Sequence, residues 1–289
     1  GRQGALLGST AVRVQEFLPD RLKISARLSA DSVEGWVSPK DLKARVTLLN
    51  LFGTPATQRR VKAILELSPT LPTFSKFRDY RFSDPMRAKE SVNDTLAEGE
   101  TNDQGEAEFD LNLSRFAAAT YRLRFLANGY ESEGGRSVAA ETQVTVSPMA
   151  YLVGWKPDGD LHYVNKGSER SVQLVAVGPQ ASRIAAPGVR SLVLERKYLS
   201  VLTKQWNGTY KYVSVKKELP VSDKPLTIPE AGLKYALPTD RPGDFVLVLK
   251  NDKDQELNRI EWSVAGTGFT GATSVTLHVS RTSGSTDST

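Results

Sequence analysis

The chain has 289 residues, which is enough for two domains. It contains no cysteine and only two histidines, His162 and His278. Disulfide scaffolds, thiolate metal sites and thiol catalysis are therefore excluded, and histidine chemistry is poorly supplied. The net charge of +5 is a mild basic excess, and no apolar run approaches the ~18 residues that a membrane helix needs. The chain begins at Gly1 without a signal-peptide pattern, which indicates a processed or excised piece.

Alternation of apolar and polar residues dominates the chain and predicts antiparallel β-structure. Such alternation places one face of a strand on a core and the other in water. The predicted strands, in chain order, are Val12–Phe17, Leu22–Leu28, Arg45–Leu48, Glu108–Leu113, Thr142–Val146, Ser171–Val175, Phe245–Leu249 and Glu261–Val264. The best helix candidate, Pro85–Leu96, lacks a continuous apolar stripe, and we interpret Ser68–Glu90 as a loop.

Short segments that contain Asn, Asp and Gly separate the predicted strands and indicate turns. They are Asn50–Gly53, Asn102–Gly105, Asn128–Gly129, Asn207–Gly208 and Asn251–Asp254. Many short strands separated by such turns are typical of β-sandwiches. We therefore predict an all-β fold of two tandem antiparallel β-sandwiches of the fibronectin/Ig-like kind.

The Asn207-Gly208 pair also predicts a register. A two-residue type I′ turn needs positive φ at both central positions, and Asn-Gly tolerates this best. Such a turn pairs Leu202 with Val213, and it opposes Lys204 to Lys211. We predict that the hairpin runs from about Ser191 to Glu218.

Prolines that follow two of the strands suggest where domains end, because proline cannot continue a central strand. Leu18-Pro19 follows the first strand, and Ser147-Pro148 follows Thr142–Val146. We therefore predict four segments. They are the closing strand of a preceding domain (residues 1–17), a β-sandwich (18–147), a second β-sandwich (148–266) and a flexible tail rich in Gly, Ser and Thr (267–289).

Motifs that suggest chemistry are weak. Gly266–Gly271 spells G-x-G-x-x-G, but a β-leaning run follows where a dinucleotide site needs a helix, so a linker is the better interpretation. The acidic runs Asp158–Asp160 and Asp252–Glu256 lack the full ligand spacing of a calcium loop. No nucleophile elbow, zinc motif or phosphate loop occurs. We predict no catalytic, cofactor-binding or metal-binding residue.

Two stretches mix basic and aromatic residues, namely Phe74–Phe82 and the hairpin that carries Lys204, Trp206, Lys211 and Tyr212. Aromatic side chains beside Lys and Arg can hold single-stranded nucleic acid. The alternative is an exposed β-ribbon whose tyrosines pair across strands while its lysines guard the edge. Because the net charge is small, we predict no nucleic-acid partner.

Several longer motifs resemble the bacterial alpha-2-macroglobulin family. Val12–Lys23 resembles the V-x-E-F-L-P join between macroglobulin-like domains; Glu16 matches the second Glu of that join, and Gln15 replaces the commoner first Glu. Further matching stretches are Leu51–Ala56, Tyr80–Pro85, Thr101–Phe109, Gly134–Val138, Gly154–Gly159, Tyr235–Phe245 and Glu256–Ile260. The resemblance covers about residues 8–266 and implies that both predicted sandwiches are macroglobulin-like domains.

The resemblance implies a non-catalytic scaffold segment of a large protease-trapping lipoprotein at the inner membrane, in the Gram-negative periplasm. In that family, which serves bacterial defence, a protease cuts a bait segment and the molecule rearranges. Many members then capture the protease through a thioester in Cys-x-Glu-Gln. This chain has no cysteine and no segment that matches the bait, so we expect both parts to lie elsewhere.

The implied partners are the neighbouring domains of the same polypeptide, proteases through the whole protein, and a cell-wall synthase of the penicillin-binding type. We expect no enzyme activity and no cofactor. The alternative interpretation is a standalone β-sandwich module that binds a polyanion or a polysaccharide. A closing strand followed by proline fits tandem, rod-like domains and favours the scaffold.

Overall fold

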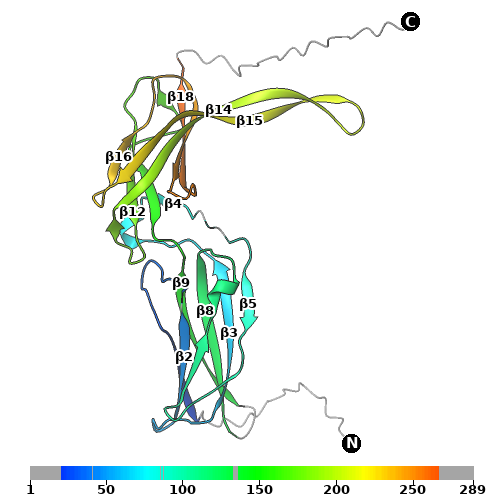
Figure 1. Cartoon of the computed structure of the whole chain (residues 1–289), viewed down its shortest axis with the longest axis vertical. Helices are drawn as coiled ribbons and strands as arrows, with labels where there is room; N and C mark the ends of the chain where they lie inside the picture. The colour runs from blue at the N-terminus through cyan, green and yellow to red at the C-terminus, as the bar shows by residue number, and fades with distance from the viewer. Residues whose placement is uncertain (1–20, 41, 85, 87, 133–135, 267–289) are drawn as a thin grey trace, which may run out of the picture.

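The computed structural model describes residues 21–266, except 41, 85, 87 and 133–135. It shows two β bodies stacked end to end, with a long ribbon that reaches out from the second (Figure 1). The described residues form strands and two short 3-10 helices, Ser75–Phe77 and Leu113–Arg115, with no α-helix among them. None of the described helices is long and apolar enough to span a membrane. The predicted all-β fold is confirmed.

The first body is a sandwich of two antiparallel sheets. One sheet has the order β1 (Leu22–Leu28), β2 (Lys43–Asn50) and β7 (Glu106–Asp110). The other has the order β5 (Val92–Thr95), β3 (Arg60–Pro69), β8 (Tyr121–Tyr130) and β9 (Ser137–Val146), with β6 (Gly99–Glu100) beside β3. Alternate side chains of both sheets, among them Leu48, Leu65 and Phe125, meet in one core. Alternation thus places apolar residues inward, as expected.

The second body is also a two-sheet sandwich. One sheet has the order β13 (Arg183–Ile184), β12 (Ser171–Val177), β10 (Leu152–Pro157) and β4 (Arg81–Phe82), with β16 (Leu233–Ala236) also on β12. The other has the order β11 (Val164–Asn165), β18 (Glu256–Ala265), β17 (Gly243–Lys250), β14 (Ala186–Lys204) and β15 (Tyr210–Ile228). Its core includes Phe245 stacked on Trp262, with ring centroids 5.5 Å apart.

Three local predictions are wrong. Asn128-Gly129 is not a turn but lies within β8, where a Cβ on Gly129 would come within 2.6 Å of the Leu48 side chain. This glycine serves close packing between the sheets. The run Glu108–Leu113 is not one strand, because β7 ends at Asp110 and a 3-10 helix begins at Leu113. Phe245–Leu249 is a strand as predicted, but its side chains do not alternate between core and water: all five residues are buried, because β17 is a central strand covered on both faces.

The hairpin turn also differs from the prediction. The Gly208 N–H donates to the Gln205 carbonyl (3.0 Å), and the Gln205 N–H donates to the Thr209 carbonyl (2.7 Å). Gly208 has positive φ and Asn207 does not, so the loop has three residues with a glycine bulge rather than a two-residue type I′ turn.

The register of the hairpin is consequently shifted by one residue. Val213 opposes Val201, and Leu202 opposes Tyr212 instead of Val213. Lys204 opposes Tyr210, so the expected Lys204–Lys211 opposition does not occur. The hairpin is also longer than predicted, since its strands begin at Ala186 and end at Ile228.

Candidate functional site: the joint and the ribbon

A loop of the first sandwich is inserted into the second at Gly35-Trp36. The Trp36 side chain is only 2% exposed. Its backbone N–H donates to the Pro179 carbonyl (3.0 Å), and its ring Nε1 donates to the Met149 carbonyl (2.9 Å). Gly35 has a φ of +89°, and a Cβ there would lie 1.9 Å from the Pro179 oxygen. Only glycine fits this approach, so the loop is locked against the second sandwich.

A second segment of the first sandwich, Phe74–Phe82, also extends into the second sandwich and carries a buried aromatic cluster. Phe74 and Phe77 are buried and pack with Phe82; the ring centroids of Phe74 and Phe82 are 4.8 Å apart. Trp36 lies 6.2 Å from Phe74, centroid to centroid. The same cluster includes Leu152 and other apolar residues of the second sandwich. The cluster therefore bridges the two bodies, and we call it the joint cluster.

The same segment also adds a strand to the second sandwich. In β4, Arg81 pairs with Trp155 and Phe82 pairs with Gly154 of β10. The buried Asn258 donates to the Val153 carbonyl (2.8 Å) and to the Arg81 carbonyl (3.3 Å). Residues 81–82 precede the predicted boundary at 147 yet extend the sheet beyond it. The division at 147/148 itself remains a prediction.

The first basic–aromatic stretch, Phe74–Phe82, is thus not a nucleic-acid platform. Its phenylalanines are packed inside the joint cluster and cannot stack on bases. Two of its charged side chains make contacts within the protein: Asp79 forms an ion pair with Lys156, and Arg81 lies over the Trp155 ring at 5.0 Å. Ser68–Glu90 is therefore not a free loop over its whole length.

Hydrogen bonds tie the end of β9 to the joint. The Val37 N–H donates to the Thr145 carbonyl (2.9 Å), and the Ser147 N–H donates to the Val37 carbonyl (3.1 Å). The buried Thr120 and Ser147 hydroxyls lie 2.8 Å apart. The backbone is therefore held on the first sandwich up to the residue before Pro148.

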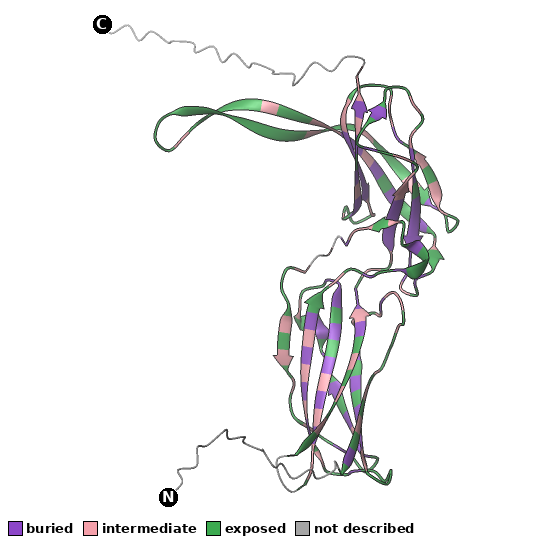
Figure 2. Ribbon diagram, turned by 180° about the vertical axis from the view of Figure 1, so that it is seen from behind, coloured by how far each residue is buried: buried purple, intermediate pink, exposed green. Residues whose placement is uncertain are grey.

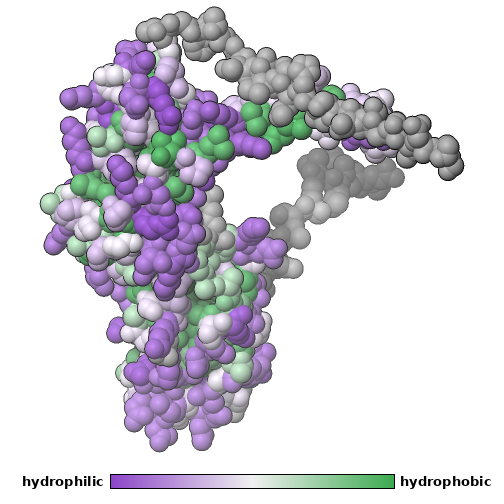
Figure 3. Space-filling model, turned by 45° about the horizontal axis from the view of Figure 1, so that its top comes forward, coloured by the Kyte–Doolittle hydropathy of each residue, from purple (hydrophilic) through white to green (hydrophobic). Residues whose placement is uncertain are grey.

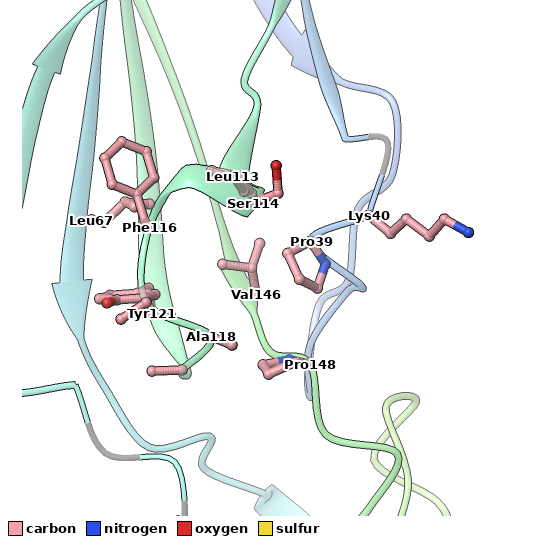
Figure 4. Close-up of a pocket in the computed structure, with 12 residues that line it drawn as sticks. Pro39, Lys40, Leu67, Leu113, Ser114, Phe116, Ala118, Tyr121, Val146 and Pro148 are labelled. Carbon is pink, nitrogen blue, oxygen red and sulfur yellow. The ribbon is translucent and has the colours of Figure 1, made fainter.

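An apolar cavity of 340 Å³ opens beside this connection (Figure 4). Its lining includes Phe116, Tyr121, Val146 and Pro148, and Figure 4 shows the Lys40 ammonium pointing away from it. Among the described lining residues, Lys40 is the one that carries a charge. Such a lining supplies no acid–base pair and suits an apolar group.

The β14–β15 ribbon leaves the second sandwich at Arg196. Up to the pair Arg196–Asp244, β14 also pairs with β17. Beyond it, within the described part of the chain, β14 and β15 pair with each other alone, out to Lys204–Tyr210 (Figure 1). Figure 2 shows this part of the ribbon as exposed almost throughout. Trp206 at its tip is 98% exposed.

An ionic network lies at the base of the ribbon. Arg196 contacts both Glu218 and Glu261, and Arg259 donates to Glu218 at 2.9 Å. Hydrogen bonding and charge from Arg196 lower the pKa of Glu261 below its ordinary value, although burial opposes this. Burial alone would raise the pKa of Glu218, but Arg259 and the other neighbouring cations outweigh it and lower that pKa. The network therefore stabilises both carboxylates in their ionised form.

The acidic runs and the histidine singled out in the sequence form no shared site. Asp158 accepts hydrogen bonds from the Ser171 N–H (2.9 Å) and hydroxyl (2.7 Å). Asp254 pairs with Arg190 and Lys250. The backbone N–H of His162 donates to the Asp160 carboxylate at 2.9 Å. Among the described residues, no group of His, Asp and Glu is arranged to hold a metal ion. The G-x-G-x-x-G motif lies, apart from its first Gly, outside the described residues.

Comparisons with known proteins point to one family. A family model described as "Bacterial Alpha-2-macroglobulin MG5 domain" matches residues 20–148. The alpha-2-macroglobulin homolog of Yersinia pestis is 46% identical over 261 residues, which are 90% of this chain and 13% of that protein. The alpha-2-macroglobulin of Pasteurella multocida is 42% identical over 263 residues, which are 90% of this chain and 14% of that protein. The chain thus spans a small part of the length of these curated relatives.

A solved structure shares the fold. The crystal structure of trypsin-activated alpha-2-macroglobulin from Escherichia coli matches with a TM-score of 0.50 and 19% identity. The match covers 87% of this chain and 17% of that chain. A structure of the E. coli protein activated by porcine elastase matches with a TM-score of 0.49 and 20% identity, over 87% of this chain and 22% of that chain.

Proposed function

The chain belongs to the bacterial alpha-2-macroglobulin family, and from this premise we propose that it is a non-catalytic scaffold segment of a longer protease-trapping protein. Its task is to hold two macroglobulin-like domains at a fixed spacing. The observation that carries the proposal is the joint cluster, in which Trp36, Phe74 and Phe77 are buried between the sandwiches. A large apolar contact between domains resists relative motion, whereas a small polar one permits it.

The trapping role rests on the relatives. The solved E. coli protein is described as activated by trypsin and by porcine elastase. In our proposal, the whole protein responds to endopeptidases in the same way. This segment fixes the relative position of its neighbouring domains and performs no chemistry. The bait and the thioester belong to other parts of the polypeptide, since a chain without cysteine cannot form a thioester.

The proposal extends to location and partners. We place the whole protein in the periplasm, with a lipid anchor in the inner membrane and a role in defence against host proteases. A cell-wall synthase of the penicillin-binding type is the proposed neighbour. These statements rest on the family resemblance.

The fixed spacing can be tested by distance measurement. Because the chain has no cysteine, K23C and K253C place one spin label on each sandwich without competing thiols. Pulsed electron paramagnetic resonance should give a narrow distance distribution, which Phe77→Ala broadens. Phe109→Ala is the matched control, because it removes a phenylalanine buried inside the first sandwich alone. A broad distribution in the parent chain would contradict the scaffold proposal.

A second measurement addresses chemistry. This chain alone should not hydrolyse a test substrate. When it is mixed with trypsin, it should not retain the protease, because two sandwiches in a row enclose nothing. A stable high-mass adduct on a denaturing gel, or protection of a bulky protein substrate beyond competition, would overturn the proposal.

A further inference from the structure

The outer part of the ribbon, residues 197–217, projects beyond the sheet of the second sandwich, and we call it the arm. Its strand pairs run from Lys197–Lys217 to Lys204–Tyr210, and among the described residues neither strand pairs with a third one there. A lone two-stranded ribbon is marginally stable in water. The arm therefore needs contacts from outside the sandwich to hold its shape.

Both faces of the arm expose apolar side chains. The register places Val201, Val213 and Val215 on one face, each between 36% and 39% exposed. It places Tyr212 on the other face at 67% exposed, together with Leu202 at 50%. Figure 3 shows apolar residues among hydrophilic ones where the ribbon leaves the body. A soluble protein rarely leaves such a two-sided apolar surface without an occupant.

The arm also carries the whole charge excess of the chain. It contains five lysines, at positions 197, 204, 211, 216 and 217, and no carboxylate. With these five set aside, the remaining 33 basic residues equal the 33 acidic residues of the chain. The occupant should therefore be negatively charged, and a second copy of the same arm is disfavoured by repulsion.

We propose that the arm is a docking element that inserts into an apolar, carboxylate-rimmed groove on another domain of the longer polypeptide. The curated relatives are long enough to supply such a domain, because this chain spans only 13% and 14% of two of them. The inference rests on one part of the proposed function, namely that this chain is a segment of a longer polypeptide; it does not require the fixed spacing of the two sandwiches.

The two-sided exposure selects a protein groove over other anionic surfaces. A bilayer or a polysaccharide surface contacts one face of a ribbon and would leave the other face in water. A nucleic acid would use the lysines and stack on Tyr210 or Tyr212, but it has no use for the valines of the opposite face. A groove buries both faces at once and pairs its rim with the lysines.

Site-specific photo-cross-linking in the longer polypeptide tests the proposal. A p-benzoylphenylalanine at position 212 probes one face of the arm, and one at position 213 probes the other. Position 163 is the control, because Tyr163 is 63% exposed but lies off the ribbon. Both arm positions should cross-link to Asp- and Glu-containing peptides of the same polypeptide, at yields at least ten-fold above position 163.

Charge reversal completes the test. The pair K204E/K211E should lower the cross-linking yield at least five-fold, whereas K166E/K234E, on exposed positions of the sandwich body, should leave it unchanged. Unchanged thermal melting of both variants confirms that folding is intact. Cross-links to lipid, nucleic acid or a second copy, cross-links from one face alone, or none at all would each overturn the proposal.

The two proposals fail separately. If the spin-label distances are broad but the arm cross-links within the polypeptide, the scaffold role falls and the docking arm stands. If the distances are narrow but the arm does not cross-link, the reverse holds.

Discussion

Two segments of this protein leave the sandwich in which they begin, and they end in opposite environments. The excursion at Phe74–Phe82 leaves the first sandwich and is buried on the second, where it adds β4 to a sheet. The β14–β15 ribbon leaves the second sandwich and stays exposed to its tip. Both mix aromatic and basic residues. Composition therefore does not decide burial; the presence of a receiving surface in the same chain does.

The largest expected effect contrasts an aromatic side chain of the joint cluster with one of the arm. Trp36→Ala or Phe74→Ala empties a site in the joint cluster and should destabilise the protein by about 3–5 kcal/mol. Tyr212→Ala on the arm should change stability by no more than about 0.5 kcal/mol, because its side chain is exposed. Urea unfolding followed by far-ultraviolet circular dichroism measures both. Equal effects would mean that the joint is not a packed interface.

Two glycines provide a matched backbone test. Gly35→Ala should cost about 2–4 kcal/mol, because φ is positive and the new Cβ would meet the Pro179 oxygen. Gly208→Ala should cost about 1 kcal/mol, since φ is also positive but nothing lies within 4 Å. Chemical denaturation gives both values. Both glycines have positive φ. The difference between the two losses of stability therefore measures the steric cost of the close approach to Pro179, separately from the cost of the backbone conformation.

The pH dependence should separate the ribbon base from the joint. The pKa values of Glu218 and Glu261 are lowered in the folded protein from an ordinary value of 4.5. Their contribution is therefore complete above pH 4.5 and is lost as the pH falls through the lower folded pKa. The double variant E218Q/E261Q should flatten the acid side of the melting profile of the second sandwich.

Glu230→Gln is the matched control for this profile, because Glu230 is exposed and lies outside the network. The joint cluster consists of apolar and aromatic side chains, so its variants should keep the acid slope of the parent. If Glu230→Gln flattened the acid side of the profile as much as the double variant does, the ionic network would not be the cause of the acid slope.

A small effect is expected at the ribbon turn. The Asn207 Oδ1 accepts hydrogen bonds from the Thr209 N–H (3.1 Å) and hydroxyl (2.7 Å). Asn207→Ala removes both and should destabilise the ribbon by about 0.5–1 kcal/mol. Nuclear Overhauser contacts should still place Val201 opposite Val213. Contacts between Leu202 and Val213 as a direct pair would instead support the two-residue turn.

Much of the fold could be predicted because alternation acts locally. In Leu22–Leu28 and Thr142–Val146, apolar residues at every second position predict a strand without any tertiary contact, and both are strands. The prediction of turns from local residue pairs fails at Asn128-Gly129, where a turn-forming pair lies inside β8. There the requirement is space for Leu48 of the facing sheet, which no local pattern displays.

The candidate site was harder to predict. The resemblance to macroglobulin-like domains, and with it the expectation of a scaffold, follows from motifs in the sequence. The joint cluster does not, because Trp36 and Phe74 are far apart in the chain. No pattern marks Trp36, and the basic–aromatic stretch that begins at Phe74 suggested a nucleic-acid surface rather than a buried contact. Gly35 immediately before Trp36 was the available signal, and it was ambiguous because glycine marks many turns.

The sequence by itself determined an all-β chain without cysteine chemistry, since strand alternation, turn residues and composition are properties of neighbouring residues. Tertiary structure decided which apolar residues are buried between the sandwiches and which remain on the arm. It also decided the ribbon register, because a single residue in the turn shifts every cross-strand pair. Burial and register depend on which surfaces meet in space, and that is set by the packing of segments distant in the chain.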